Sequence, residues 1–181
     1  MRERKKVIFM YQVGELVLYG STGVCKVEEI REQNFPSTGE KRLYYTLRPL
    51  YEDCVISVPV DSDKVFIRPI ISREEAERLI AGIPKVRVEM YHSRVSRELT
   101  EHYEAILRSH DCGSLVELTM SIYAKKQSFQ EQKRKFGTVD ERLLKRAEDL
   151  LFGELAAALE IPKDQVQGYI ASKLEYDKAV G

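Results

Sequence analysis

Three neighbouring residues, His110, Asp111 and Cys112, combine a base, an acid and a nucleophile by type. Side chains that are adjacent in sequence rarely converge on one substrate atom, because catalytic triads are assembled in space from separate segments. The three residues precede an apolar helical pattern, so we interpret them as the turn before a helix. We therefore expect that the protein is not an enzyme.

Metal and redox chemistry are equally poorly supported by residue spacing. Cys25, Cys54 and Cys112 lie far apart and include no CxxC pair, so neither a zinc site nor a disulfide framework is predicted. The three histidines lack the i, i+4 spacing of a helical metal pair. We expect no metal and no cofactor, and interpret the cysteines as small buried apolar residues.

Charge is balanced over the whole chain, with 29 basic and 29 acidic side chains, but its distribution is uneven. Residues 85–146 carry 13 Lys or Arg and 9 Asp or Glu, whereas residues 147–181 carry 3 and 7. A basic segment in a neutral protein can bind a polyanion locally, and it can equally be a solvated helix surface.

The elements that must position these charges divide near residue 70. Before it, β-branched and aromatic residues are interrupted by Gly and Pro turn signals. Five short strands are predicted, over residues 15–19, 24–31, 42–48, 54–58 and 64–68. So many short strands in about 60 residues favour a small antiparallel β barrel of the SH3 or Tudor type, because a barrel covers most of its edges. We assign residues 10–70 to this domain and expect residues 1–9 to be a flexible extension.

The second half has a helical pattern. Ser72, Ser114 and Thr138 are each followed three residues later by Glu, as in a capping box that starts a helix. Sustained 3–4 spacing over residues 86–109 predicts a further helix, and Ile161-Pro162 predicts a last one to about residue 174. Residues 71–181 are therefore expected to form a bundle of about five helices, which makes the chain an α+β protein with two domains.

The expected location is the cytoplasm. No stretch approaches the roughly 18 consecutive apolar residues of a membrane-spanning helix. The apolar run of residues 7–10 is also too short for the core of a signal peptide.

The segment Tyr11–Ile30, with Val13-Gly14-Glu15, an apolar run to Tyr19, a Gly-containing turn and Val27-Glu28-Glu29-Ile30, resembles the opening of the CarD family of bacterial transcription regulators. The same small domain occurs in the transcription-repair coupling factor. Later segments of the chain match in the expected order, namely residues 58–61, 67–69 and 142–156.

The resemblance implies an N-terminal domain that docks on the β subunit of RNA polymerase. It also implies a helical domain that touches promoter DNA at the upstream edge of the bubble, through shape and backbone more than base sequence. Such a protein stabilises the open complex and has neither a cofactor nor catalytic activity.

For the polymerase contact, the strand at residues 41–48 is the candidate, with Lys41, Arg42 and Arg48. A small sheet offers an edge on which an extended partner segment can pair by β-augmentation. The alternative is a solvated strand face. Many relatives use an arginine on the fourth strand for this contact, and Ser57 occupies that position here.

For the DNA contact, phosphate binding needs cations spread over a few helical turns. Arg142 and Arg146 lie four residues apart and share one helix face. A solvated charge is the alternative for each candidate. The candidates are Arg94, Arg97, Lys125, Lys126, Lys133, Arg134, Lys135, Arg142, Lys145 and Arg146.

The chain lacks the Trp that family members usually wedge into the minor groove. Tyr91 or Tyr123 could substitute, but both lie at core spacing. A second function remains open: a small β barrel could bind RNA or the ribosome. That function would require exposed aromatic residues on the strands, for which Tyr44, Tyr45 and Tyr51 are the candidates.

Overall fold

The computed structural model describes residues 10–34 and 39–180. The chain forms two compact units with the boundary between Pro69 and Ile70, one residue before the boundary expected from sequence. The expected flexible extension of residues 1–9 lies outside the described residues.

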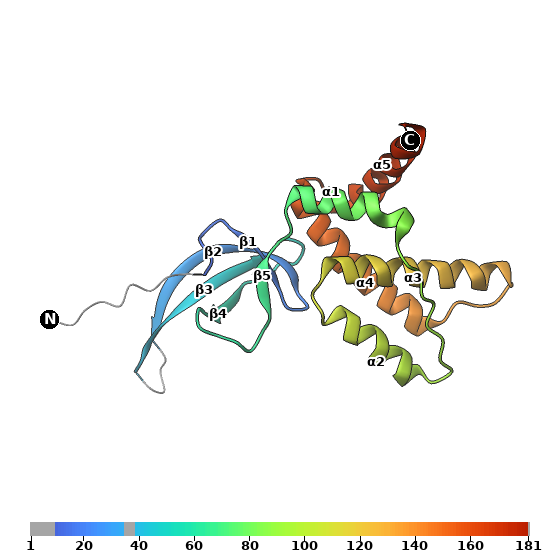
Figure 1. The fold of residues 1–181 in the computed structure, drawn as a ribbon. Coiled ribbons are helices and arrows are strands. Elements are labelled where there is room, and N and C mark those ends of the chain that lie inside the picture. The colour runs from blue at the N-terminus through green and yellow to red at the C-terminus, as the bar shows by residue number, and fades with distance from the viewer. Residues whose placement is uncertain (1–9, 35–38, 181) are drawn as a thin grey trace. The chain divides into compact units, whose positions relative to one another are not determined.

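The N-terminal unit is a five-stranded antiparallel sheet (Figure 1). Its strands lie in the order β4-β3-β2-β1-β5. Their bounds are β1 Leu16–Tyr19, β2 Gly23–Asn34, β3 Lys41–Pro49, β4 Ile56–Pro59 and β5 Ile67–Pro69. The number and antiparallel pairing of the strands confirm the α+β prediction. The sheet is not closed into a barrel, because β4 and β5 are short end strands that each pair on one side only.

Alternation along β3 places Tyr45 and Leu47 in the core of this unit, together with Val17 and Val27. Tyr11 makes hydrogen bonds to two separate strands of the unit, β3 and β5. Its backbone N–H donates to the Tyr45 hydroxyl at 3.2 Å, and its own hydroxyl donates to the carbonyl of Ile67 at 3.1 Å.

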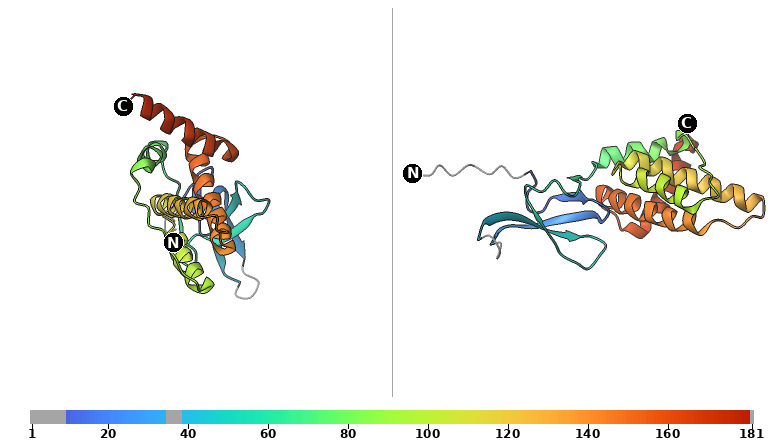
Figure 2. Two further views of the ribbon diagram at one scale, coloured as in Figure 1. Left: turned by 90° about the vertical axis from the view of Figure 1, so that its right-hand side faces the viewer. Right: turned by 90° about the horizontal axis from the view of Figure 1, so that it is seen from below.

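The C-terminal unit is helical, with α3 packed on α4 and α5 folded back beside α1 (Figure 2). The five helices are α1 Arg73–Gly82, α2 Ser96–Leu107, α3 Cys112–Glu131, α4 Thr138–Leu159 and α5 Val166–Val180. There are also two short 3-10 helices. The first, Ile83–Lys85, follows α1, and the second, Lys163–Gln165, directly precedes α5. A bundle of about five helices was the prediction, and it is confirmed.

Two helix starts differ from the sequence prediction. The helix predicted from residue 86 begins only at Ser96, because side chains satisfy the backbone of the preceding segment: Glu89 N–H donates to Ser121 Oγ at 3.0 Å. Helix α3 begins at Cys112, before the predicted cap, because the carboxylate of Asp111 accepts from the N–H of Ser114 at 2.7 Å. Asp111 is thus a helix cap.

The start of α4 was also predicted with the wrong cap. Thr138 is the first helical residue, and Gly137 precedes it without a side-chain capping bond. A Cβ on Gly137 would lie 2.9 Å from the carboxylate of Asp140, so any larger residue would require this carboxylate to shift. At Ser72, one of the two bonds of the predicted capping box is confirmed: the N–H of Glu75 donates to Ser72 Oγ at 3.1 Å.

Candidate functional site

The sheet of the N-terminal unit has an edge at β4, not at β3 as the sequence suggested. Residues Tyr44–Leu47 of β3 pair with β2 on one side and with β4 on the other. Within the described residues, no strand covers the outer side of β4. A partner segment that adds a strand therefore has to pair with β4 along this stretch.

The backbone of Ser57 points to that outer side. The N–H of Val60 donates to the carbonyl of Leu43 at 2.9 Å, which makes these two a hydrogen-bonded pair. Hydrogen-bonded and non-hydrogen-bonded pairs alternate along an antiparallel ladder, so Ser57 opposite Thr46 is a non-hydrogen-bonded pair. Its N–H and carbonyl consequently face away from β3. Pro59, two residues on, has no N–H to offer, so the pairing edge is short.

The cations predicted to face the polymerase are exposed, but each has a carboxylate neighbour. Arg48 Nε donates to Glu28 at 2.7 Å, and this bond raises the pKa of Arg48. Lys41 lies 4.0 Å from Glu32, and Arg42 lies 3.4 Å from Glu40. Exposed pairs of this kind contribute little to stability, so a partner can compete for the cations.

Ser57 has a polar neighbourhood. The side-chain amide of Gln33 lies 3.3 Å from Ser57 Oγ. When the amide oxygen of Gln33 is turned toward Ser57, this oxygen also accepts two hydrogen bonds from the guanidinium of Arg31, at 3.0 and 3.2 Å. The side-chain amide of Gln33 therefore links the guanidinium of Arg31 to Ser57. Ser57 is the position where relatives are expected to carry an arginine.

The aromatic residues that an RNA-binding barrel would need are mostly buried. Tyr44 is 6% exposed and Tyr45 is 2% exposed, so neither ring offers a face to a base. Tyr51 is 42% exposed and is the one member of this group on the surface.

The C-terminal unit has a basic cleft of about 580 Å³, which we call the α3–α4 cleft. It lies where the segment before α2 faces the end of α3 and the start of α4. Four basic side chains and one acidic side chain line it, together with two aromatic rings. These residues are Arg94, Lys125, Arg134, Lys135, Asp140, His92 and Phe129. The cleft thus brings together four residues that were predicted separately as DNA contacts.

The end of α3 places Arg134 in the cleft. Arg134 N–H donates to the carbonyl of Phe129 at 2.8 Å, and Lys133 N–H donates to that of Gln130 at 3.0 Å. These two bonds, with Lys133 at a φ of 54°, are those of a Schellman motif. The reversal of the chain lays the guanidinium of Arg134 over the ring of Phe129, 4.4 Å from its centre.

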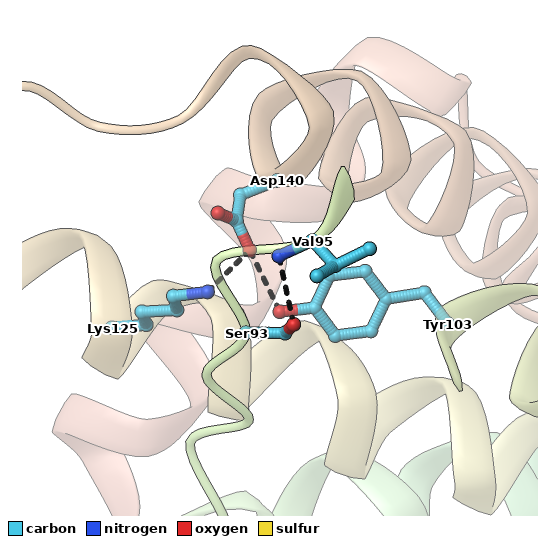
Figure 3. A network of polar contacts seen from close by, with 5 residues as sticks. All are labelled: Ser93, Val95, Tyr103, Lys125 and Asp140. Atoms are coloured by element: carbon cyan, nitrogen blue, oxygen red, sulfur yellow. Dashed lines mark hydrogen bonds and ion pairs between the residues drawn. The ribbon is translucent and has the colours of Figure 1, made fainter. Parts of the chain in front are cut away.

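Lys125 lies in the cleft wall but does not reach solvent, contrary to its prediction as a DNA contact. It is 2% exposed, and its ammonium donates to Asp140 at 2.8 Å (Figure 3). The same carboxylate oxygen accepts from the hydroxyl of Tyr103 at 2.7 Å. Burial and this bond raise the pKa of Tyr103. Lys125 neutralises Asp140, and so leaves Arg94, Arg134 and Lys135 as the exposed charges of the cleft.

The remaining predicted cations lie outside the cleft lining. Arg97 pairs with Glu101 and Arg146 with Glu104, each at 2.6 Å. Lys126 is half-buried, with its ammonium 5.7 Å from the ring centre of Phe136. Arg97 is exposed despite its pair, and Lys133, Arg142 and Lys145 are exposed as well.

The two tyrosines considered as a wedge are packed into the helical unit. Tyr91 stacks on His102 with ring centres 3.9 Å apart, and Tyr123 donates its hydroxyl to Glu148. Burial and the bond to Glu148 raise the pKa of Tyr123. Neither ring projects as an exposed wedge.

Metal sites and membrane-spanning helices are both absent from the described residues. In residues 10–34 and 39–180, no group of three His, Cys, Asp or Glu side chains could hold a metal ion. The same residues include no helix long and apolar enough to cross a membrane.

A small sheet with a strand edge and a helical bundle with a basic cleft are features of proteins that bind macromolecules. A comparison with protein-family models identifies the first unit: residues 11–71 match the model of the CarD-like/TRCF RID domain. The chain therefore contains this RNA-polymerase-interacting domain and is a transcription-related protein.

Sequence reasoning missed the roles of His92, Phe129 and Asp140 in forming the cleft. His92 was considered only with the other histidines as a possible metal ligand, and no binding role was predicted for Phe129. The Phe129–Arg134 spacing does carry a signal, because Schellman geometry brings these two positions together. The contact of His92 with α3 has no such local signal.

Proposed function

We propose that the protein binds the β subunit of RNA polymerase through the RID domain and contacts promoter DNA through the helical unit. The contact is at the upstream edge of the bubble, and it stabilises the open complex. The match of residues 11–71 to the CarD-like/TRCF RID domain is the observation that carries this proposal.

The polymerase contact uses the outer edge of β4. An extended segment of the β subunit hydrogen-bonds to the outward N–H and carbonyl of Ser57 and lies beside the exposed cations of β3. Main-chain bonds supply the affinity, while Arg42 and Arg48 supply charge complementarity to an acidic partner surface.

The DNA contact uses the α3–α4 cleft. Arg94, Arg134 and Lys135 are exposed cations from two separate segments, and the N-terminus of α4 lies beside them, where the N-cap residue Gly137 makes no side-chain capping bond. Cations and a helix N-terminus together suit phosphate oxygens. Arg142 and Lys145 on the exposed side of α4 extend the basic surface beyond the cleft.

The protein has no catalytic role in this proposal, needs neither a metal nor a cofactor, and acts in the cytoplasm where transcription occurs. An RNA- or ribosome-binding function is disfavoured by the burial of Tyr44 and Tyr45.

The lifetime of the open complex tests the proposal. Preformed promoter complexes are challenged with heparin, and the loss of open complex is followed with and without the protein. The wild-type chain is expected to lengthen the half-life several-fold. Arg94→Glu combined with Lys135→Glu is expected to return the half-life to that of polymerase alone, since it replaces two phosphate contacts by repulsion.

The matched control is Arg108→Glu, which reverses an exposed arginine at the end of α2 outside the cleft lining. This variant is expected to behave as wild type. An unchanged half-life with the wild-type protein at saturating concentration contradicts the proposal, as does a loss of effect that Arg108→Glu shares.

A further inference from the structure

The α3–α4 cleft contains two aromatic rings in addition to the cations that would bind phosphate. His92 and Phe129 lie in it with their rings nearly parallel, at 8°, and their centres 6.3 Å apart. His92 is exposed, while Phe129 is half-buried beneath the guanidinium of Arg134. Phosphate contacts are made by cationic and hydrogen-bonding groups, so the ring of Phe129 adds nothing to them.

From this geometry we infer that the α3–α4 cleft binds an unpaired base of single-stranded DNA. The base stacks on the exposed face of His92, and the phosphates flanking it contact Arg94, Arg134 and Lys135. This combination of aromatic faces and cations is the one by which proteins hold single strands without reading their sequence. That the strand is DNA rests on the proposed function.

An unpaired base fits the site better than a duplex does. Inside a duplex both faces of each base are covered by its neighbours, so no face is available to His92. The cleft volume of about 580 Å³ is also in the range of pockets that enclose a small molecule the size of a nucleotide. A melted strand supplies such a base, with phosphates on both sides.

The ring stack is held in place by contacts from several elements. Phe129 is flanked by Arg134 and by Phe136, whose ring meets it edge-on with centres 6.2 Å apart. In the wall of the cleft, the Lys125–Asp140 pair connects α3 to the first turn of α4. Since this support exists before any strand binds, little ordering of the cleft is required on binding.

Fluorescence anisotropy with the full-length protein, in the absence of polymerase, tests the inference. Two labelled oligonucleotides are compared: fifteen thymidines, and the same backbone carrying abasic sites in place of its central bases. The wild-type protein is expected to bind the complete strand about tenfold more tightly than the abasic one. His92→Ala is expected to abolish this difference, whereas Arg94→Ala weakens both complexes equally.

Tyr51→Ala is the matched control, since it removes an exposed ring from the other unit. It is expected to leave the preference for the complete strand unchanged. The inference is overturned if wild type binds both strands equally, if Tyr51→Ala and not His92→Ala removes the preference, or if the RNA strand of the same sequence binds more tightly. Because no polymerase is present, these results are independent of the open-complex test.

Discussion

Thr119 of α3 is 2% exposed, and its hydroxyl has no hydrogen-bond partner among the described residues. A buried hydroxyl without a partner costs free energy, because it gives up its bonds to water on folding. Thr119→Val replaces the hydroxyl by a methyl group of similar size. We expect it to raise the free energy of unfolding of the helical unit by about 1–2 kcal/mol, measured by urea denaturation followed at 222 nm.

Thr119→Ser is the control for this substitution, since it keeps the hydroxyl and removes the methyl group. It is expected to lower stability, because it leaves a small void in the core. A lower stability of Thr119→Val than of wild type would mean that the hydroxyl is bonded after all.

The three thiols differ in burial, and we expect their reactivity to differ accordingly. Burial raises the pKa of Cys25 to about 12, and Cys112 is 3% exposed, whereas Cys54 is exposed. Only the thiolate attacks a disulfide reagent, so Cys25 is inert near neutral pH. We expect Ellman's reagent to titrate one thiol per native chain at pH 8, and three in denaturant.

The Cys54→Ala variant identifies the reactive thiol. It is expected to show no rapid reaction in the native state. Rapid reaction of two thiols in the native wild-type protein would contradict the burial of Cys25 or of Cys112.

At the level of elements, the Lys125–Asp140 pair connects α3 to α4 inside the helical unit. Both side chains are less than 5% exposed, so removing one charge leaves the other buried without a partner. Lys125→Met is therefore expected to lower the free energy of unfolding by about 3–5 kcal/mol. Urea denaturation at 222 nm measures the loss.

The double variant Lys125→Met with Asp140→Asn separates the charge effect from packing. The asparagine is neutral and can still accept from the hydroxyl of Tyr103. We expect the double variant to recover most of the loss. A loss below about 1 kcal/mol in the single variant would show that Asp140 has access to solvent.

Elements with local signals were predictable from the sequence. Tyr45 and Leu47 alternate with other residues along β3, which is the local pattern of a strand with a core face, and Ser72 with Glu75 predicted the start of α1. The ends of α3 and α4 were harder to predict, because their left-handed residues are Lys133 and Glu160 and not glycine.

Features that depend on contacts between distant segments were not predictable. The burial of Lys125 requires Asp140 from another helix, and the edge position of β4 depends on the order of the strands. In the candidate site, the cations of the cleft were predicted from the sequence, but the two aromatic rings among them were not. His92 and Phe129 are 37 residues apart in the chain, so no local pattern indicates that they lie together.

At the level of the whole molecule, the two units divide the proposed work. In the proposed function, the RID domain carries the protein to the polymerase, and the cleft of the helical unit adds contacts to DNA. Such a linkage raises the effective concentration of a weak DNA site near the bubble, so the cleft need not bind DNA tightly by itself.

Binding of the full-length protein to the purified β subunit is the most direct test of this account. We expect binding at micromolar concentration. Ser57→Pro, which removes the outward N–H from the edge of β4, is expected to weaken it at least tenfold, while Ser57→Ala, which keeps that N–H, binds as wild type. No binding of the wild-type chain at micromolar concentration, or equal binding by Ser57→Pro, would contradict the account.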